Sequence, residues 1–207
     1  TFVPPSFSWK VAPLTLVGSR SSSNVTDTFA LRSTPLAPIP GLLVVIAGGG
    51  AVAYGTTNDG KTWTSSGWGY VVGDEGSGFS VGRKAINAIF RSFDGRNPPT
   101  RLSEYIFPEL GVTSAVELKY AIFEGRIHFD HIAGLAPIIA QAAVEGDLAA
   151  GSILVDAGHE IADSAKAVVH ALFSSTSTVN IYPTGGLFNE KSVFYPSFKE
   201  AILEEIG

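Results

Sequence analysis

Three glycine clusters constrain the fold of this chain more than any other feature. Residues 42–46 form a continuous aliphatic run that stops at Gly48, Gly49 and Gly50. Such a run, closed by glycines, is typical of a buried strand followed by a turn. The other two clusters fall at residues 67–78 and at Gly185 and Gly186. The predicted elements follow in the order strand, glycine turn, hairpin, helices, strand, glycine turn and helix. This order predicts an α/β fold with ligand loops at the carboxyl ends of strands.

The segments between the clusters carry a hairpin and a series of helices. The sequence Asn58-Asp59-Gly60 indicates the hairpin turn. We expect helices over residues 81–93, 103–110 and 130–145, after caps at Ser114 and Asp147, and from Pro196 or Ser197 to Ile206. Residues 1–23, rich in proline and serine, form an atypical N-terminal segment. Residues 24–207 form one domain, divided into turns (24–78), a helical region (79–175) and a last strand and helix (176–207).

The composition narrows the possible partners. The chain has 207 residues, of which 45% are hydrophobic and 16% charged, so it can bury a core. Its formal net charge is −5 and it has no cluster of Lys or Arg, so we expect no nucleic-acid partner. It has no cysteine, which excludes disulfides and cysteine-ligated metal sites in this chain. Its four histidines are scattered, and we expect no metal held by side chains.

Neither a membrane span nor a signal peptide is visible in the sequence. The run at residues 42–47 is far too short to cross a bilayer. The N-terminus has no basic region followed by an apolar one. We therefore expect a soluble, cytoplasmic protein.

The glycine clusters are candidate phosphate sites. Successive backbone N–H groups in such turns can surround an anion, and a following helix adds the positive end of its dipole. Three clusters in a chain without a basic cluster favour a phosphate-bearing ligand held mostly by backbone. The alternative for each cluster is a tight turn with no ligand, because glycine commonly serves turns alone.

Three carboxylates and one tryptophan complete the candidate site. Asp27 could orient and deprotonate a hydroxyl that attacks a phosphate, or it could cap a helix. Asp74 and Glu75 could accept hydrogen bonds from hydroxyls of a ligand, or could only close their own turn. Trp68, which lies between two glycines, could form an apolar wall for a ligand or fill a gap in the core. Spacing alone does not separate these alternatives.

Two blocks of the sequence carry a family resemblance. The segments IAGGGAVAYG (residues 46–55) and GWGYVVGDEGSG (residues 67–78) resemble the group of N-acetylglucosamine kinases and benzoyl-CoA reductase activator ATPases. Residues 132–137, 142–147 and 153–158 are similar to the helical region of that group, and residues 184–188 to its adenosine-site turn. The resemblance extends from about Val25 to the end. It implies the ribonuclease H-like fold of the actin/hexokinase/Hsp70-like ATPases, with a helical region.

On the sugar side, the resemblance implies a role for each candidate residue. Asp27 would be the catalytic base that accepts the proton of the attacking hydroxyl. Asp74, with Glu75 beside it, would hold hydroxyls of the sugar, and Gly67 and Trp68 would line that pocket. The implied substrate is an amino sugar or a hexose.

On the nucleotide side, the resemblance implies ATP, with magnesium bound together with the nucleotide. Gly48, Gly49 and Gly50 match the second phosphate turn of the family. Gly185 and Gly186 match the turn that packs against the adenosine. The oligomeric state is left open, a homodimer being one option.

The chain also departs from the family pattern. Gly49 and Ala51 stand where the phosphate turn usually carries a threonine and a serine, which removes two hydroxyl donors worth about 1.5–3 kcal/mol each. No Asp-Gly-Gly hairpin precedes Asp27, and no glycine–alanine helix closes the chain after the adenosine turn. We therefore expect a fold that is incomplete relative to the two-lobed family fold.

Three functions follow from these observations. The first is a sugar kinase of the N-acetylglucosamine kinase type. The second is an activator ATPase of the benzoyl-CoA reductase type, against which the lack of cysteines argues, since such activators hold an iron–sulfur cluster. The third is a remnant that binds sugar or nucleotide without turnover, and the departures at Gly49 and Ala51 motivate it.

Overall fold

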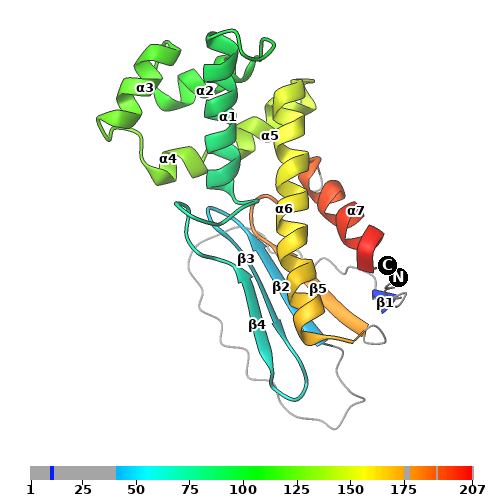
Figure 1. Ribbon diagram of the computed structural model, residues 1–207. Coiled ribbons are helices and arrows are strands. Elements are labelled where there is room, and N and C mark those ends of the chain that lie inside the picture. The colour runs from blue at the N-terminus through cyan, green and yellow to red at the C-terminus, as the bar shows by residue number, and fades with distance from the viewer. Residues whose placement is uncertain (1–9, 12–40, 175–177, 190, 207) are drawn as a thin grey trace, which may run out of the picture.

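The computed structural model describes residues 10–11, 41–174, 178–189 and 191–206, which build a five-stranded sheet with helices (Figure 1). The strand order is β1-β5-β2-β3-β4. The strands are β1 (Lys10–Val11), β2 (Gly41–Ala47), β3 (Ala51–Thr56), β4 (Thr62–Ser66) and β5 (Thr178–Thr184). β2, β3 and β4 are antiparallel neighbours, whereas β5 runs parallel to β1 and β2. This confirms the expected α/β class. Asp27 lies outside the described residues, as does all of the segment 1–23 except β1.

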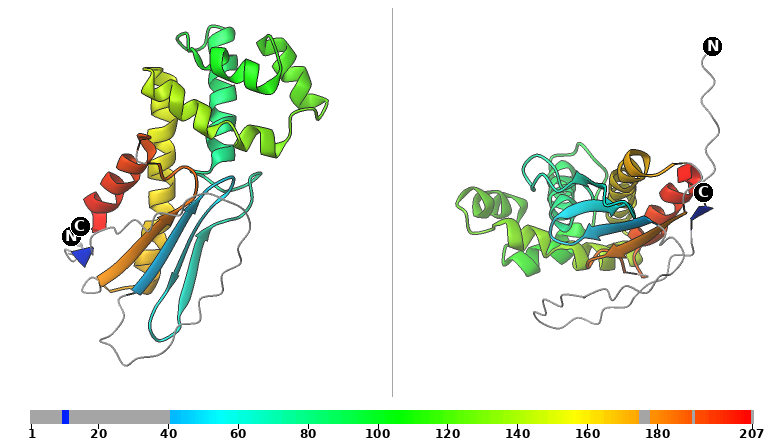
Figure 2. Two further views of the ribbon diagram at one scale, coloured as in Figure 1. Left: turned by 180° about the vertical axis from the view of Figure 1, so that it is seen from behind. Right: turned by 90° about the horizontal axis from the view of Figure 1, so that it is seen from below.

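Most of the helices gather at the end of the sheet where β2 and β5 stop (Figure 1). They are α1 (Gly78–Phe93), α2 (Leu102–Leu110), α3 (Ala115–Phe123), α4 (Phe129–Ala133), α5 (Ala136–Val144), α6 (Leu148–Leu172) and α7 (Phe194–Ile206). The long helix α6 runs from this group along one face of the sheet, and α7 packs on α6 (Figure 2). No helix within the described ranges is both long enough and apolar enough to cross a membrane.

The core lies between the sheet and α6. Leu43, Val45 and Ala47 of β2 are fully buried on this side. Gly55 of β3 has no room for a side chain, because a Cβ there would lie 2.5 Å from the side chain of Val168 on α6. The close approach of the backbone to α6 thus depends on glycine. The buried apolar cluster continues from this layer into the other helices.

The buried strand expected at residues 42–46 is present as β2, but only one of its faces is fully buried. The alternate side chains Leu42 and Ile46 are 38% and 41% exposed. They lie on the side of the sheet opposite α6, since successive side chains of a strand point to opposite faces. A continuous aliphatic run therefore corresponds here to a strand buried on one face only.

Helix α1 begins three residues before the expected residue 81, and two further differences from the sequence prediction involve proline. The predicted helix over residues 130–145 is two helices, α4 and α5, separated by Gly134 and Leu135. Pro137 explains the break, because in a continuous helix its ring would collide with the carbonyl of Ala133, four residues earlier. The last helix begins at Phe194 instead of Pro196 or Ser197. Proline fits in that first turn because the amides there have no partner within the helix.

Asp147 joins the start of α6 to the start of α2. Its side chain, in a residue only 7% exposed, accepts hydrogen bonds from Ala150 N at 2.8 Å, from Thr100 Oγ1 at 2.8 Å and from Arg101 N at 2.7 Å. Burial alone would raise the pKa of Asp147, but these hydrogen bonds outweigh burial and lower the pKa below its ordinary value of 3.8. The predicted cap at this residue is confirmed.

We expect Asp147→Ala to lower the free energy of unfolding by about 2 kcal/mol at pH 7. Because the pKa is lowered in the folded protein, the carboxylate stabilises the fold above the unfolded pKa, and this is lost as the pH falls through the folded pKa. In urea unfolding, the difference in free energy of unfolding between the wild type and Asp147→Ala should therefore shrink as the pH is lowered from 7 to about 3. Asp163→Ala, at an exposed residue of α6, is the control and should change little. An equal difference at both pH values would contradict the role of the charge.

Candidate functional site

The glycine turns after β2 and β5 lie side by side. Leu187 N donates a hydrogen bond to Ala47 O, the last carbonyl of β2, at 3.2 Å. A Cβ at Gly185 would lie 2.2 Å from the same oxygen, and the φ of Gly185 is +111°. Only glycine permits both this conformation and this approach. Two segments far apart in the sequence thus form one edge of the site, as their position after parallel strands predicts.

The β2 turn is also fixed to the start of α1. Gly78 N donates to Gly48 O at 2.7 Å, and Phe79 N donates to Gly49 O at 3.2 Å. Ser77, the N-cap, accepts from Ser80 N at 3.1 Å. The expected helix follows the glycine cluster, but its first amides bind protein oxygens. Helix α1 therefore orients the turn and does not present these amides to a ligand.

A cavity of about 400 Å³ opens where the two turns meet. It is bounded by the β2 turn, the β5 turn, the start of α1 and the junction of α4 and α5. Residues that line it include Gly48, Gly49, Gly78, Gly134, Pro137 and Gly186. No charged side chain belongs to its lining in the described part of the chain. The cavity is thus formed largely by backbone.

The glycines of this site are of two physical kinds. A Cβ at Gly50 would lie 2.8 Å from Asp74 Oδ2, so a side chain there would displace the Asp74 carboxylate. At Gly48 and Gly186 an added Cβ would meet no described atom within 4 Å, and at Gly49 the nearest is 3.8 Å away. Packing does not account for glycine at these three positions. A side chain there would instead occupy space in or beside the cavity.

Asp74 connects the loop of residues 67–78 to the β2 turn. It is 8% exposed and has a φ of +58°. Its Oδ1 accepts from Gly69 N at 3.0 Å, so the carboxylate does close its loop, as the alternative interpretation proposed. Its Oδ2, directed towards Gly50, has no hydrogen-bond partner among the described residues. One oxygen of a largely buried carboxylate is therefore available to a ligand.

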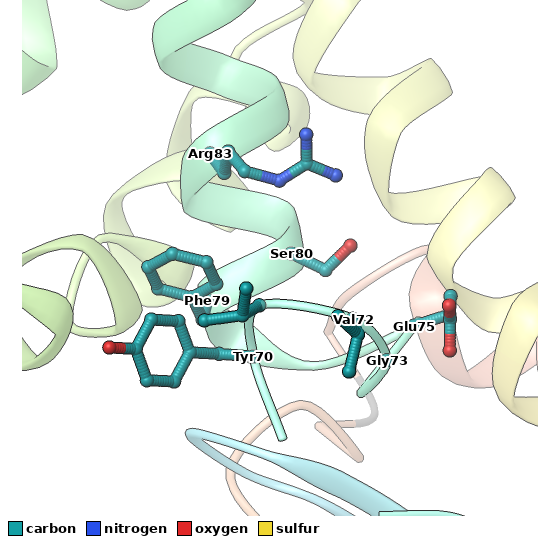
Figure 3. Close-up of a pocket in the computed structure, with 8 residues that line it drawn as sticks. Tyr70, Val72, Gly73, Glu75, Phe79, Ser80 and Arg83 are labelled. Carbon is teal, nitrogen blue, oxygen red and sulfur yellow. The ribbon is translucent and has the colours of Figure 1, made fainter. Parts of the chain in front are cut away.

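The other predicted site residues of this loop lie in different environments. Trp68 is 79% exposed, so the interpretation that it fills a gap in the core is wrong. Its role as a ligand wall stays a prediction. Gly67 is held against Val52 with a φ of +76°. Glu75 is exposed and lines a second cavity, of about 490 Å³, on the α1 side of the loop (Figure 3).

Two residues that the sequence did not indicate hold this loop in place. Glu160 Oε2 on α6 accepts from Gly76 N at 3.0 Å, and its Oε1 forms an ion pair with Lys84 Nζ on α1 at 2.6 Å. Gly76 itself lies so close to α6 that a Cβ would be 2.7 Å from Ala157 O. Glu160 is 84 positions from Gly76. No local pattern could have predicted the pairing.

We expect Glu160→Ala to release the loop locally. Loss of a hydrogen bond to a charged acceptor costs about 1.5–3 kcal/mol, so the Gly76 amide should exchange its hydrogen roughly 10- to 100-fold faster. Hydrogen–deuterium exchange measures this directly. Glu117→Ala is the matched control, because Glu117 accepts from Thr113 N at 2.8 Å in a distant loop. If the Gly76 amide exchanges equally in both variants, Glu160 does not fix the loop.

The described residues contain no group of three or more His, Cys, Asp or Glu placed to hold a metal ion. The closely spaced pair His128 and His131 has a structural role, since His128 N donates to His131 Nδ1 at 3.0 Å at the start of α4. These residues thus provide no ready-made side-chain set for magnesium.

Known proteins resemble this chain in both sequence and fold. The model of the BadF/BadG/BcrA/BcrD ATPase family matches residues 40–207. The N-acetylmuramic acid/N-acetylglucosamine kinase of Clostridium acetobutylicum is 35% identical over 158 residues, which is 76% of this chain and 52% of the relative. The N-acetyl-D-glucosamine kinase of Dictyostelium discoideum is 26% identical over 164 residues, 78% of this chain and 51% of the relative. The chain therefore spans about half the length of the curated relatives it matches.

Two solved structures show the same fold. One is a protein of Chromobacterium violaceum, provisionally assigned as an N-acetylglucosamine kinase, with a TM-score of 0.60 and 24% identity. The match covers 82% of this chain and 55% of that protein. The other, from Porphyromonas gingivalis and with the same assignment, has a TM-score of 0.56 and 22% identity over 78% of this chain and 52% of that protein.

Proposed function

The chain belongs to the BadF/BadG/BcrA/BcrD ATPase family, and on that premise we propose that it is part of a sugar kinase of the N-acetylglucosamine kinase type. In this proposal the γ-phosphoryl group of ATP passes to a hydroxyl of an amino sugar or hexose. The described residues would contribute one wall of the nucleotide site and one side of the sugar site.

The observation that carries the proposal is the meeting of the two glycine turns in one uncharged cavity. Membership of an ATPase family implies the use of ATP. The open space at Gly48 and Gly186 supports a ligand that approaches the backbone closely, as phosphates and a ribose do. Magnesium would be bound by the phosphates of the nucleotide and not by a cage of side chains from the described residues.

On the sugar side, Asp74 is the best-supported residue. The unpartnered Oδ2 of this buried carboxylate could accept a hydrogen bond from a sugar hydroxyl. Glu75, Gly67 and Trp68 follow as further sugar-binding candidates. Asp27, outside the described residues, is proposed as the catalytic base on the sequence resemblance alone.

A binding protein without turnover is the second candidate. Gly49 and Ala51 replace the two hydroxyl residues that the phosphate turn of the family usually carries, and Ala51 is 3% exposed. An activator ATPase is disfavoured, because this chain has no cysteine for an iron–sulfur cluster.

A coupled assay for ADP release separates these candidates. The whole protein that contains this chain is incubated with ATP, magnesium and, in turn, N-acetylglucosamine, glucosamine and glucose. ADP release that depends on one of these sugars would support the kinase. Calorimetry that detects sugar binding without ADP release would favour the binding protein, and ADP release independent of every sugar would contradict both.

A further inference from the structure

Arg83 differs from the other arginines of the described residues. Arg91, Arg96, Arg101 and Arg126 each donate a hydrogen bond to a neighbouring side chain. Arg83, exposed on α1, has neither a hydrogen bond nor an ion pair within the described ranges. An arginine presents five donors in a rigid planar fork, so an unused guanidinium beside a cavity is a potential anion site.

The guanidinium of Arg83 extends over the cavity of about 490 Å³ (Figure 3). Ser80, one turn earlier on α1, directs its hydroxyl to the same side of the helix. The rings of Tyr70 and Phe79 pack with centroids 4.9 Å apart and close one side of the cavity. A donor fork, a hydroxyl and apolar walls thus face one open cavity.

The carboxylates near Arg83 do not neutralise its positive charge by an ion pair. Glu160 on α6 is the acceptor of Lys84, the next residue of α1, and of the Gly76 amide. Glu75, which lines the same cavity, makes no ion pair with Arg83. An anionic ligand can therefore enter without displacing an internal partner of the arginine.

We propose that this cavity binds the carboxylate of an acidic sugar, with Arg83 as its cationic donor and Ser80 as a second donor. A carboxylate matches the fork of a guanidinium in geometry and charge. Glu75, elsewhere in the lining, accepts a hydrogen bond from a hydroxyl or amide of the same ligand. This inference rests on the proposed function, since Gly73 and Glu75 of the cavity flank Asp74, the proposed sugar-holding residue.

The phosphates of ATP are a poorer match for Arg83. The cavity proposed for the nucleotide shares no lining residue with the cavity of Arg83. The start of α1 contributes Gly78 to the proposed nucleotide cavity, and Phe79 and Ser80 to the cavity of Arg83. A substituent on the sugar therefore accounts for the arginine better than the nucleotide does.

Calorimetry on the whole protein tests the proposal with two probes that differ only in a lactyl group. N-acetylmuramic acid carries this carboxylate and N-acetylglucosamine does not. We expect the wild type to bind both, and Arg83→Gln to weaken binding of N-acetylmuramic acid by about tenfold while changing N-acetylglucosamine by less than about twofold. Arg126→Gln is the matched control, because Arg126 is exposed and pairs with Glu124 far from this loop.

Each other outcome overturns the inference in a recognisable way. Binding of N-acetylglucosamine alone, or equal weakening of both sugars by Arg83→Gln, would show that Arg83 does not bind a carboxylate, and would leave the proposed kinase intact. If Arg83→Gln weakened the binding of ATP equally, the arginine would be assigned to the nucleotide site. Binding of neither sugar by the wild type would remove the proposed function together with the inference.

Discussion

Gly185→Ala is expected to lower the free energy of unfolding by about 3 kcal/mol, whereas Gly186→Ala should leave it within about 0.5 kcal/mol. At Gly185 the new Cβ would be 2.2 Å from Ala47 O and the residue would keep a φ of +111°. At Gly186 it would meet no described atom within 4 Å. Gly185 is thus required by the fold, whereas glycine at position 186 leaves space that a ligand could occupy.

Gly186→Ala should weaken nucleotide binding although it leaves the free energy of unfolding almost unchanged. A methyl group at Gly186 would fill part of the cavity and cost about 1–3 kcal/mol of binding, so the Kd for ATP should rise roughly tenfold or more. Gly146→Ala is the control for backbone strain alone, since Gly146 has a φ of +92° and no neighbour within 4 Å. Urea unfolding and calorimetry with ATP measure both quantities. Unchanged ATP binding in folded Gly186→Ala would argue against this cavity as the nucleotide site.

Asp27→Asn is expected to reduce sugar-dependent ADP release by about 10²- to 10⁴-fold. Asparagine keeps the size of the side chain but cannot accept the proton of the attacking hydroxyl. ATP binding should be unchanged, because the proposed base contacts the sugar and not the nucleotide. Asp156→Asn, at an exposed residue of α6, is the control and should retain full activity. ADP release that survives Asp27→Asn would remove Asp27 as the base.

Local sequence patterns were sufficient for most elements of the fold. The hairpin of β3 and β4 follows from Asn58-Asp59-Gly60, and Gly60 has the positive φ, +85°, that such a turn demands. The caps at Ser114 and Asp147 were likewise predictable, because each side chain accepts from an amide three residues later. These features depend on neighbours in the sequence, and short patterns record such neighbours well.

One difference from the sequence prediction arose where distant contacts decide the structure, and the other was local. The half-exposed Ile46 depends on which face of the sheet α6 covers, and a continuous aliphatic run does not encode that choice. Pro137 was visible in the sequence, and its collision with a helical carbonyl four residues earlier could have predicted the break between α4 and α5.

The candidate site was predicted in part. The glycine turns after β2 and β5 could be identified from their position after strands, and the structure brings them together. Glu160, Lys84 and Arg83 could not be found, because their roles depend on how α1 and α6 face the loop.

The first amides of α1 have a consequence for how strongly this site depends on ionic strength. Gly78 N and Phe79 N are already bonded to carbonyls, and the adjoining cavity has no charged lining among the described residues. Counterions weaken attraction between formal charges far more than they weaken van der Waals contact or neutral hydrogen bonds. The contribution of this cavity to the proposed nucleotide affinity should therefore persist in concentrated salt. A phosphate site built on lysine would lose most of its affinity under the same conditions.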